Sequence, residues 1–100
     1  MMNNKFNPND ATLSVDLSEA TQAVKENRFD DALNLFTIIL EDHPDNIDAL
    51  YLASVSSRYL KNFDDSKEYI ERLMFNAPDM GRAYQELGHI YRDMGNEAKA

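Results

Sequence analysis

The chain has 100 residues, of which 43% are hydrophobic, so it is long enough to bury one modest core in a single domain. Its 18 acidic and 10 basic residues give a formal net charge of −8, which argues against binding to duplex DNA or to an anionic membrane surface. No cysteine is present, which excludes disulfides and thiolate metal sites and fits a reducing compartment.

The first ten residues, MMNNKFNPND, are rich in asparagine and lack the apolar segment of a signal peptide. We predict that residues 1–10 form a flexible N-terminal tail. No apolar run in the chain approaches the length that would span a membrane. We therefore expect a soluble, cytoplasmic protein.

Helical periodicity runs through the rest of the sequence, and no stretch shows the sustained alternation of polar and apolar residues that is typical of strands. Apolar or small residues recur at helical spacing in five stripes, which are, in chain order, Leu13, Leu17, Ala20 and Val24; Ala32, Phe36, Ile39 and Leu40; Leu50, Ala53 and Ser57; Tyr69, Ile70, Leu73 and Met74; and Tyr84, Leu87, Tyr91 and Met94. The pattern predicts an all-α protein.

The turns between the predicted helices repeat with a fixed period. The segment NRFDDALNLF at 27–36 returns as KNFDDSKEYI at 61–70, and HPDN at 43–46 returns as APDM at 77–80. The numbers of corresponding positions differ by 34 in both cases. A period of 34 in a helical sequence indicates a solenoid of helix-turn-helix units.

The repeated turns contain residues suited to ending one helix and beginning the next. Asp-Asp pairs at 30–31 and 64–65 place negative charge in the first turn of a helix, where it opposes the helix dipole favourably. Pro44 and Pro78 interrupt the preceding helices, and we expect the aspartate after each proline to be available as a cap.

These residues resemble the tetratricopeptide repeat family. Its pattern has bulky, leucine, small and tyrosine positions at 4, 7, 8 and 11 of the repeat, alanine, aromatic and alanine positions at 20, 24 and 27, and proline at 32. The second helical pair supplies Leu50, Ala53, Ser54, Ser57, Ser66, Ile70, Leu73 and Pro78, and the third supplies Tyr84, Leu87, Gly88 and Tyr91. The first pair supplies Ala32, Phe36, Ile39 and Pro44, and its first helix fits as Leu17, Ala20, Thr21 and Val24 only if the intervening turn is one residue shorter.

The resemblance covers about residues 13–100. It implies a right-handed superhelical stack of antiparallel helix pairs over residues 11–100, with two full repeats and the first helix of a third. In such a stack Phe36 and Ile70 are expected to be buried between helices.

The end of the sequence falls at a repeat position. Ala32, Ser66 and Ala100 occupy the same position of successive repeats, so the chain stops where the second helix of a third repeat would begin to pack. We therefore expect an N-terminal fragment of a longer protein. Residues 82–94 should expose an apolar strip, including Leu87 and Tyr91, that favours self-association through this end.

A concave groove is the binding surface that the resemblance implies, because the first helices of successive repeats line it in this family. Its inner positions correspond to Asp48, Tyr51, Val55 and Arg58 in the second repeat and to Arg82, Gln85, His89 and Arg92 in the third. With the shorter turn, the first repeat contributes Val15, Ser18, Gln22 and Lys25.

The candidate groove residues are Lys25, Tyr51, Val55, Arg58, Arg82, Gln85, His89 and Arg92. Four basic residues and a histidine then face a single acid, Asp48, which implies a partner protein or an acidic peptide as ligand. The alternative is that the arginines pair with local carboxylates, such as Glu86 four residues after Arg82.

No catalytic, cofactor-binding or metal-binding constellation is visible in the sequence. There is no glycine-rich phosphate loop and no thiol nucleophile, and the two histidines lie far apart in the sequence. We therefore expect an interaction module without enzymatic activity of its own.

A weaker resemblance connects residues 49–96 to the N-terminal repeats of bacterial proteins that fuse tetratricopeptide repeats to a sulfotransferase domain. It rests on the segments RYL, GRAYQE and GHIYRD. It implies an alternative function, namely an accessory domain of a larger enzyme whose catalytic domain lies outside this chain.

Overall fold

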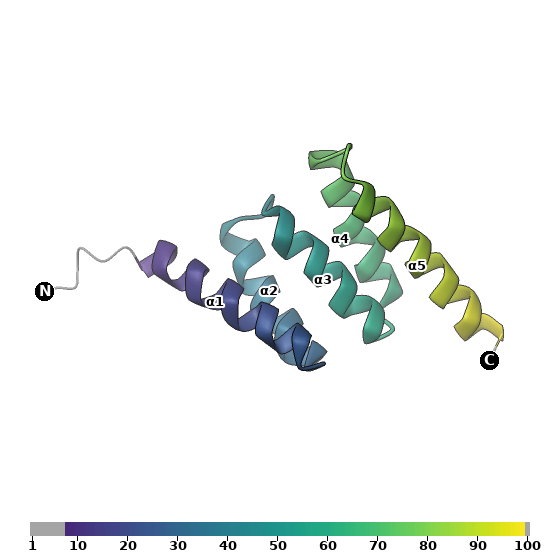
Figure 1. Ribbon diagram of the computed structural model, residues 1–100, viewed down its shortest axis with the longest axis horizontal. Coiled ribbons are helices and arrows are strands. Elements are labelled where there is room, and N and C mark those ends of the chain that lie inside the picture. The colour runs from purple at the N-terminus through teal and green to yellow at the C-terminus, as the bar shows by residue number, and fades with distance from the viewer. Residues whose placement is uncertain (1–7, 100) are drawn as a thin grey trace, which may run out of the picture.

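The computed structural model describes residues 8–99, and the side chains of residues 17–97, as a chain of helices without a strand in that range (Figure 1). The helices are α1 (Pro8–Lys25), α2 (Phe29–Asp42), α3 (Ile47–Tyr59), α4 (Phe63–Asn76) and α5 (Gly81–Lys99). The predicted all-α fold is confirmed.

The first helix begins inside the segment that the sequence predicts as a tail. α1 starts at Pro8, because proline has the backbone angle that the first position of a helix needs and no amide hydrogen to leave unpaired there. The tail predicted over residues 1–10 is thus helical from residue 8, and residues 1–7 lie outside the described range.

The helices pack as antiparallel pairs in two layers. α1 packs on α2, α3 on α4, and α5 on both α4 and α3. In Figure 1, α1, α3 and α5 form the near layer and α2 and α4 the far layer of an elongated molecule of 58 × 28 × 18 Å. The near layer therefore presents one continuous face built from alternate helices.

The core lies between the two layers. Phe36 of α2, Leu50 of α3, Ile70 and Leu73 of α4, and Ile90 of α5 are fully buried. The predicted burial of Phe36 and Ile70 is confirmed. Both α2 and α4 present one apolar face to this core and a polar face to solvent, since their apolar residues recur every three or four positions.

The two helices of the second pair touch at small residues. Ser54 Oγ donates to the carbonyl oxygen of Ser66 at 2.8 Å, and Ser66 Oγ donates to the carbonyl oxygen of Ser54 at 2.7 Å. Ala20 and Ala32, which hold the same positions one repeat earlier, are fully buried in the first pair. Small side chains at these positions let the two backbones approach closely.

The first turn has full length, so the expectation of a turn shortened by one residue is wrong. Three residues separate α1 from α2 and three separate α3 from α4. Each turn passes through one residue with a positive φ, Asn27 at 62° and Lys61 at 66°, which hold the same position of consecutive repeats. Because a left-handed residue ends the helix at the same position of both turns, the period is unbroken, and among the described side chains of α1 Ala20 and Ala23 are buried.

The helix cap after Pro44 also differs from the expectation. Asn46, not Asp45, caps α3, since its side chain accepts a hydrogen bond from the backbone N–H of Ala49 at 2.9 Å. Asp45 is exposed and instead accepts from Asn76 Nδ2 at 3.3 Å.

Candidate partner-binding groove

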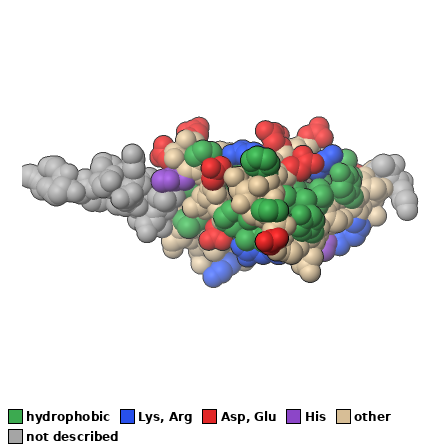
Figure 2. All heavy atoms as spheres, turned by 90° about the horizontal axis from the view of Figure 1, so that it is seen from above, with side chains coloured by type: hydrophobic (Ala, Val, Ile, Leu, Met, Phe, Trp, Pro, Cys, Tyr) green, Lys and Arg blue, Asp and Glu red, His purple; other side chains and the backbone are tan. Residues whose placement is uncertain are grey.

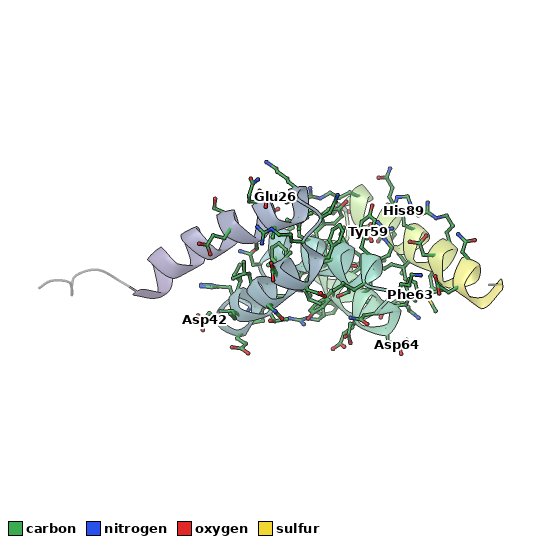
Figure 3. All side chains as sticks on the ribbon, turned by 90° about the horizontal axis from the view of Figure 1, so that it is seen from below. Glu26, Asp42, Tyr59, Phe63, Asp64 and His89 are labelled. Atoms are coloured by element: carbon green, nitrogen blue, oxygen red, sulfur yellow. The ribbon has the colours of Figure 1, made fainter. Side chains whose placement is uncertain are left out.

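The predicted groove residues lie on the near layer, but they do not form one set. Seven of the eight belong to α3 and α5, which contact each other, while Lys25 ends α1. Lys25, Arg82, Gln85, His89 and Arg92 are exposed, Tyr51 and Val55 are half-buried, and Arg58 is buried. Figure 3 shows His89 on the α5 side of the molecule, on the opposite edge from Asp42 and Asp64 of the far layer.

Arg82 is held against α3 by two contacts. Its guanidinium lies over the ring of Tyr51, 4.4 Å from the centroid, and its Nη2 donates to Asp48 Oδ1 at 3.2 Å. The side chains of Arg82 and Asp48 keep 46% and 64% exposure. This exposed cation is therefore fixed in orientation by an aromatic ring while several of its N–H donors face solvent.

Arg92 lies near the other end of α5 beside His89. Arg92 Nη1 is 3.2 Å from His89 Nδ1, and Arg92 Nε donates to Asp93 Oδ1 at 2.9 Å. The Arg92 side chain is 56% exposed. Arg92 thus places a second guanidinium on the same helix as Arg82, and the carboxylate of Asp93 partly neutralises its charge.

Arg58 does not line the groove as the repeat position implies. Its side chain is 8% exposed; Nε and Nη2 donate to the two carboxylate oxygens of Glu86 at 2.5 and 3.3 Å, and Nη1 donates to Asp93 Oδ2 at 2.9 Å. Arg58 therefore ties α3 to α5 and is not available to a partner. Arg58 thus pairs with carboxylates of its own chain, as the alternative predicted. Glu86, which the sequence suggested as the partner of Arg82, pairs with Arg58 instead.

The protonation of this cluster follows from its contacts. Burial works against the charge of Arg58, but the hydrogen bonds to Glu86 and Asp93 outweigh it and hold the pKa of Arg58 above its ordinary value. Burial would raise the pKa of Asp93, yet the hydrogen bonds from Arg58 and Arg92 lower it below the ordinary value. Arg58 and Asp93 are therefore both charged at neutral pH.

A sequence signal for the cluster exists in α5. Ala83, Glu86, Ile90 and Asp93 share one stripe of the helix, and two carboxylates within an otherwise apolar stripe require a buried cation. The repeat pattern alone places Arg58 on the groove, because it identifies positions and not the partners that arrive from the next helix.

The full-length first turn changes which residues of α1 hold groove positions. With an unbroken period these are Leu17, Thr21 and Val24, one residue before the predicted Ser18, Gln22 and Lys25; the side chain of Val15 lies outside the described residues. Leu17, Ser18, Thr21, Gln22 and Lys25 line a shallow hollow of about 350 Å³. Since α1 and α5 do not contact each other in the described range, Lys25 is not grouped with Arg82 and Arg92.

A smaller hollow that the sequence did not indicate lies where α3 ends and α4 begins. Its volume is about 210 Å³, and it is lined by Arg58, Tyr59, Lys61, Phe63, Asp93, Asn96 and Glu97. The ring of Tyr59 stacks on Phe29 with centroids 4.5 Å apart, and Lys61 Nζ pairs with Glu97 at 2.7 Å. These contacts close the turn end of the repeats, and Figure 3 shows Tyr59 and Phe63 in this region.

Charge is divided between the two layers. The far layer carries four acidic and no basic residues in α2, and four acidic and two basic residues in α4. Figure 2 shows Asp and Glu side chains mostly along one long edge and Lys and Arg mostly along the opposite edge. The acidic excess of the chain therefore lies mainly away from the α3–α5 surface.

Neither a metal site nor a membrane span is found among the described residues. No group of three or more His, Asp or Glu side chains in that range is arranged to hold a metal ion. None of the described helices combines the length and the apolar character needed to cross a membrane.

Comparisons with known proteins address the family and the fold. The profile of the tetratricopeptide repeat family matches residues 23–87. Among solved structures, a mutant of the protein MamA aligns with a TM-score of 0.79 and 20% sequence identity, over 87% of this chain and 64% of that chain. The chain thus spans less than two-thirds of that structure, and at this identity the likeness shows the fold. A comparison with curated proteins gives no significant match.

Proposed function

Since the chain belongs to the tetratricopeptide repeat family, we propose that it is a protein-interaction module that binds an acidic segment of a partner protein on its α3–α5 face. We define the α3–α5 face by its half-buried or exposed residues on the near layer, which are Asp48, Tyr51, Val55, Arg82, Gln85, His89 and Arg92. Repeat solenoids use such extended faces to bind partners.

The observation that carries this proposal is the orientation of Arg82. Its guanidinium lies over the Tyr51 ring, 4.4 Å from the centroid, and its Nη2 donates a hydrogen bond to Asp48. Its other N–H groups have no hydrogen-bond partner among the described residues. Planar donors of this kind engage carboxylates in pairs. Because the ring already restricts the side chain, less conformational entropy is lost when a ligand carboxylate binds.

The spacing of the two exposed arginines sets the length of the ligand. Arg82 and Arg92 are ten residues apart on one helix, which corresponds to about 15 Å along its axis. An extended peptide covers this distance in about four to five residues. We therefore propose a partner segment with acidic side chains four to five positions apart, lying along α5, with apolar contact supplied by Tyr51 and Val55.

A labelled oligoglutamate peptide tests the proposal by fluorescence anisotropy. Arg82→Glu combined with Arg92→Glu should abolish binding of the peptide. The matched control combines Arg28→Glu with Arg72→Glu, which changes the net charge by the same amount at arginines of the α1–α2 turn and of α4. The control should bind nearly as the parent does, and binding by the parent should weaken with added salt.

If both double variants lost peptide binding equally, the loss would be due to overall charge and not to the α3–α5 face. Undiminished binding by the Arg82/Arg92 variant would exclude that face as the binding site. The helical signal of each variant, followed by circular dichroism, separates lost binding from lost folding.

The alternative function, an accessory domain of a sulfotransferase, rests on the sequence resemblance alone. The three segments that carry this resemblance contain Arg58, Glu86 and Asp93, the members of the buried ion cluster. Packing between α3 and α5 accounts for those residues without an enzyme. The gene sequence beyond residue 100 tests the alternative, which requires a phosphosulfate-nucleotide loop there; further repeats of the same period without such a loop would favour the interaction module.

A further inference from the structure

The outward stripe of α5 lacks the cover that the same positions have on α3. Leu50, Ala53, Ser54 and Ser57 of α3 are fully buried, because α4 packs over them. Their equivalents in the next repeat are Tyr84, Leu87, Gly88 and Tyr91. Tyr84 and Tyr91 are 50% and 52% exposed, Gly88 is exposed and Leu87 is half-buried.

Two tyrosines and two glycines alternate along this stripe. Tyr84, Gly88, Tyr91 and Gly95 follow one another at intervals of four, three and four residues, which places them on one face of a helix. We call them the tyrosine–glycine stripe. A Cβ atom built on Gly88 or Gly95 would meet no atom within 4 Å, so each glycine is an open gap between protruding rings.

Both tyrosines are held in position by the chain itself. The hydroxyl of Tyr84 donates to the carbonyl oxygen of Pro78 at 3.0 Å. The ammonium of Lys67 on α4 lies 5.2 Å from the centroid of Tyr91. The rings are therefore preorganised as knobs, and their insertion into a complementary surface costs little side-chain entropy.

We propose that the tyrosine–glycine stripe binds the same stripe of a second copy of this chain, with the two α5 helices antiparallel. When Gly88 faces Tyr91 of the second copy, Tyr84 faces Gly95 of the second copy, because both pairs of numbers have the same sum. By the two-fold symmetry each ring enters a glycine gap of the other helix. The spacing of the stripe is thus complementary to its own reverse, as an isologous interface requires.

The residues beside the stripe fit this register. On one flank Leu87 approaches Met94 of the second copy, and both are half-buried apolar side chains. On the other flank Gln85 approaches Arg92 of the second copy, so the amide oxygen can accept from the guanidinium. No acidic residue belongs to the stripe or to these flanks.

The charge of the chain favours this face over the others. Two copies with a net charge of −8 each repel one another, most strongly through the acidic far layer. The stripe is uncharged, and the exposed charge on its flank, Arg92, is positive. One helix pair makes a small interface, so we expect association that depends on concentration in the micromolar range or above.

Exchanging one tyrosine with one glycine tests the register. Gly88→Tyr places two rings against each other at both symmetry-related sites and should weaken self-association of the 100-residue chain by about tenfold or more. Tyr91→Gly leaves facing gaps and should also weaken it. Combining Gly88→Tyr with Tyr91→Gly puts a ring opposite a gap again and should restore it. Sedimentation equilibrium over a concentration series measures each variant.

Asn34→Leu serves as the control, since Asn34 is exposed on α2, which does not contact α5 in the described range, and should leave association unchanged. Gly88→Tyr meets open space in the single chain, so its fold should be intact by circular dichroism. The proposal is overturned if the parent is monomeric throughout, if Gly88→Tyr strengthens association as added apolar surface alone would, or if the exchange does not restore it. The variants leave Arg82 in place, so peptide binding tests the proposed function separately.

Discussion

The buried face of α3 carries four polar side chains whose hydrogen bonding differs. Ser54 is bonded to Ser66 across the helix pair, and Arg58 is bonded to Glu86 and Asp93. Ser56 Oγ and Ser57 Oγ are buried without a partner among the described residues. A buried hydroxyl that is bonded stabilises the fold, whereas one without a partner loses its hydration and gains nothing in return.

The same substitution at two of these serines should therefore have different effects. Ser54→Ala removes a bonded hydroxyl and should cost about 1 kcal/mol of unfolding free energy. Ser57→Ala removes an unpartnered one, and Ala23 occupies the equivalent position of the first repeat, so its effect should be neutral or stabilising. Chemical denaturation of both variants measures the difference; an equal loss in both would refute the assignment of the two hydroxyls.

Asp93 should make the fold sensitive to acid. Its pKa is lowered in the folded chain, against burial, by hydrogen bonds from Arg58 and Arg92. A carboxyl with a lowered pKa contributes stability that is fully present above its ordinary value of 3.8 and is lost as the pH falls through the folded value. The parent should lose stability as the pH falls below about 4, and Asp93→Asn should be less stable at neutral pH and lose less in acid. Denaturation midpoints across this pH range check the prediction, and parallel pH profiles would contradict it.

At the scale of the helix, most of the fold follows from periodicity. The five stripes, the repeated turns and the burial of Phe36 and Ile70 were all predictable, because a fixed repeat period determines both helix faces and their order. The ends of the helices were harder to predict from the sequence. The length of the first turn depends on the left-handed conformation of Asn27. Glycine is the usual sequence signal for that conformation, but asparagine can adopt it as well, so the turn is hard to recognise from the sequence.

The candidate site was predictable only in part, for a related reason. The repeat pattern places Arg58, Arg82 and Arg92 on one layer, which is where they lie. It does not say which carboxylates arrive from the following helix, and so it misses that Glu86 and Asp93 take Arg58 out of the groove. Contacts between neighbouring helices, unlike periodicity within one helix, are decided by individual side chains.

Two phenylalanines test the assignment of helix faces. Phe36 of α2 is fully buried, so Phe36→Ala should cost about 3–5 kcal/mol, enough to unfold much of so short a stack at room temperature. Phe75 of α4 is 87% exposed, so Phe75→Ala should leave the melting temperature nearly unchanged. Thermal melts of the two variants give the comparison, and similar shifts would mean that the buried faces are wrongly assigned.

At the scale of the whole molecule, the two layers have different tasks. Both layers contribute buried apolar residues to the core, and the far layer of α2 and α4 carries most of the acidic surface. The near layer carries the exposed arginines Arg82 and Arg92, and Arg82 lies over the ring of Tyr51. An acidic partner is repelled by the far layer and attracted to the near one, so charge alone orients its approach before any specific contact forms.

The central claim is that partners bind on the α3–α5 face, and mapping by NMR tests it most directly. The chain labelled with ¹⁵N is titrated with an oligoglutamate peptide while its backbone amide shifts are followed. We predict saturable shifts at Tyr51, Val55, Arg82, Gln85 and His89, with α2 and the outer positions of α4 unaffected. Shifts concentrated on the far layer, or a uniform response that does not saturate, would contradict the account.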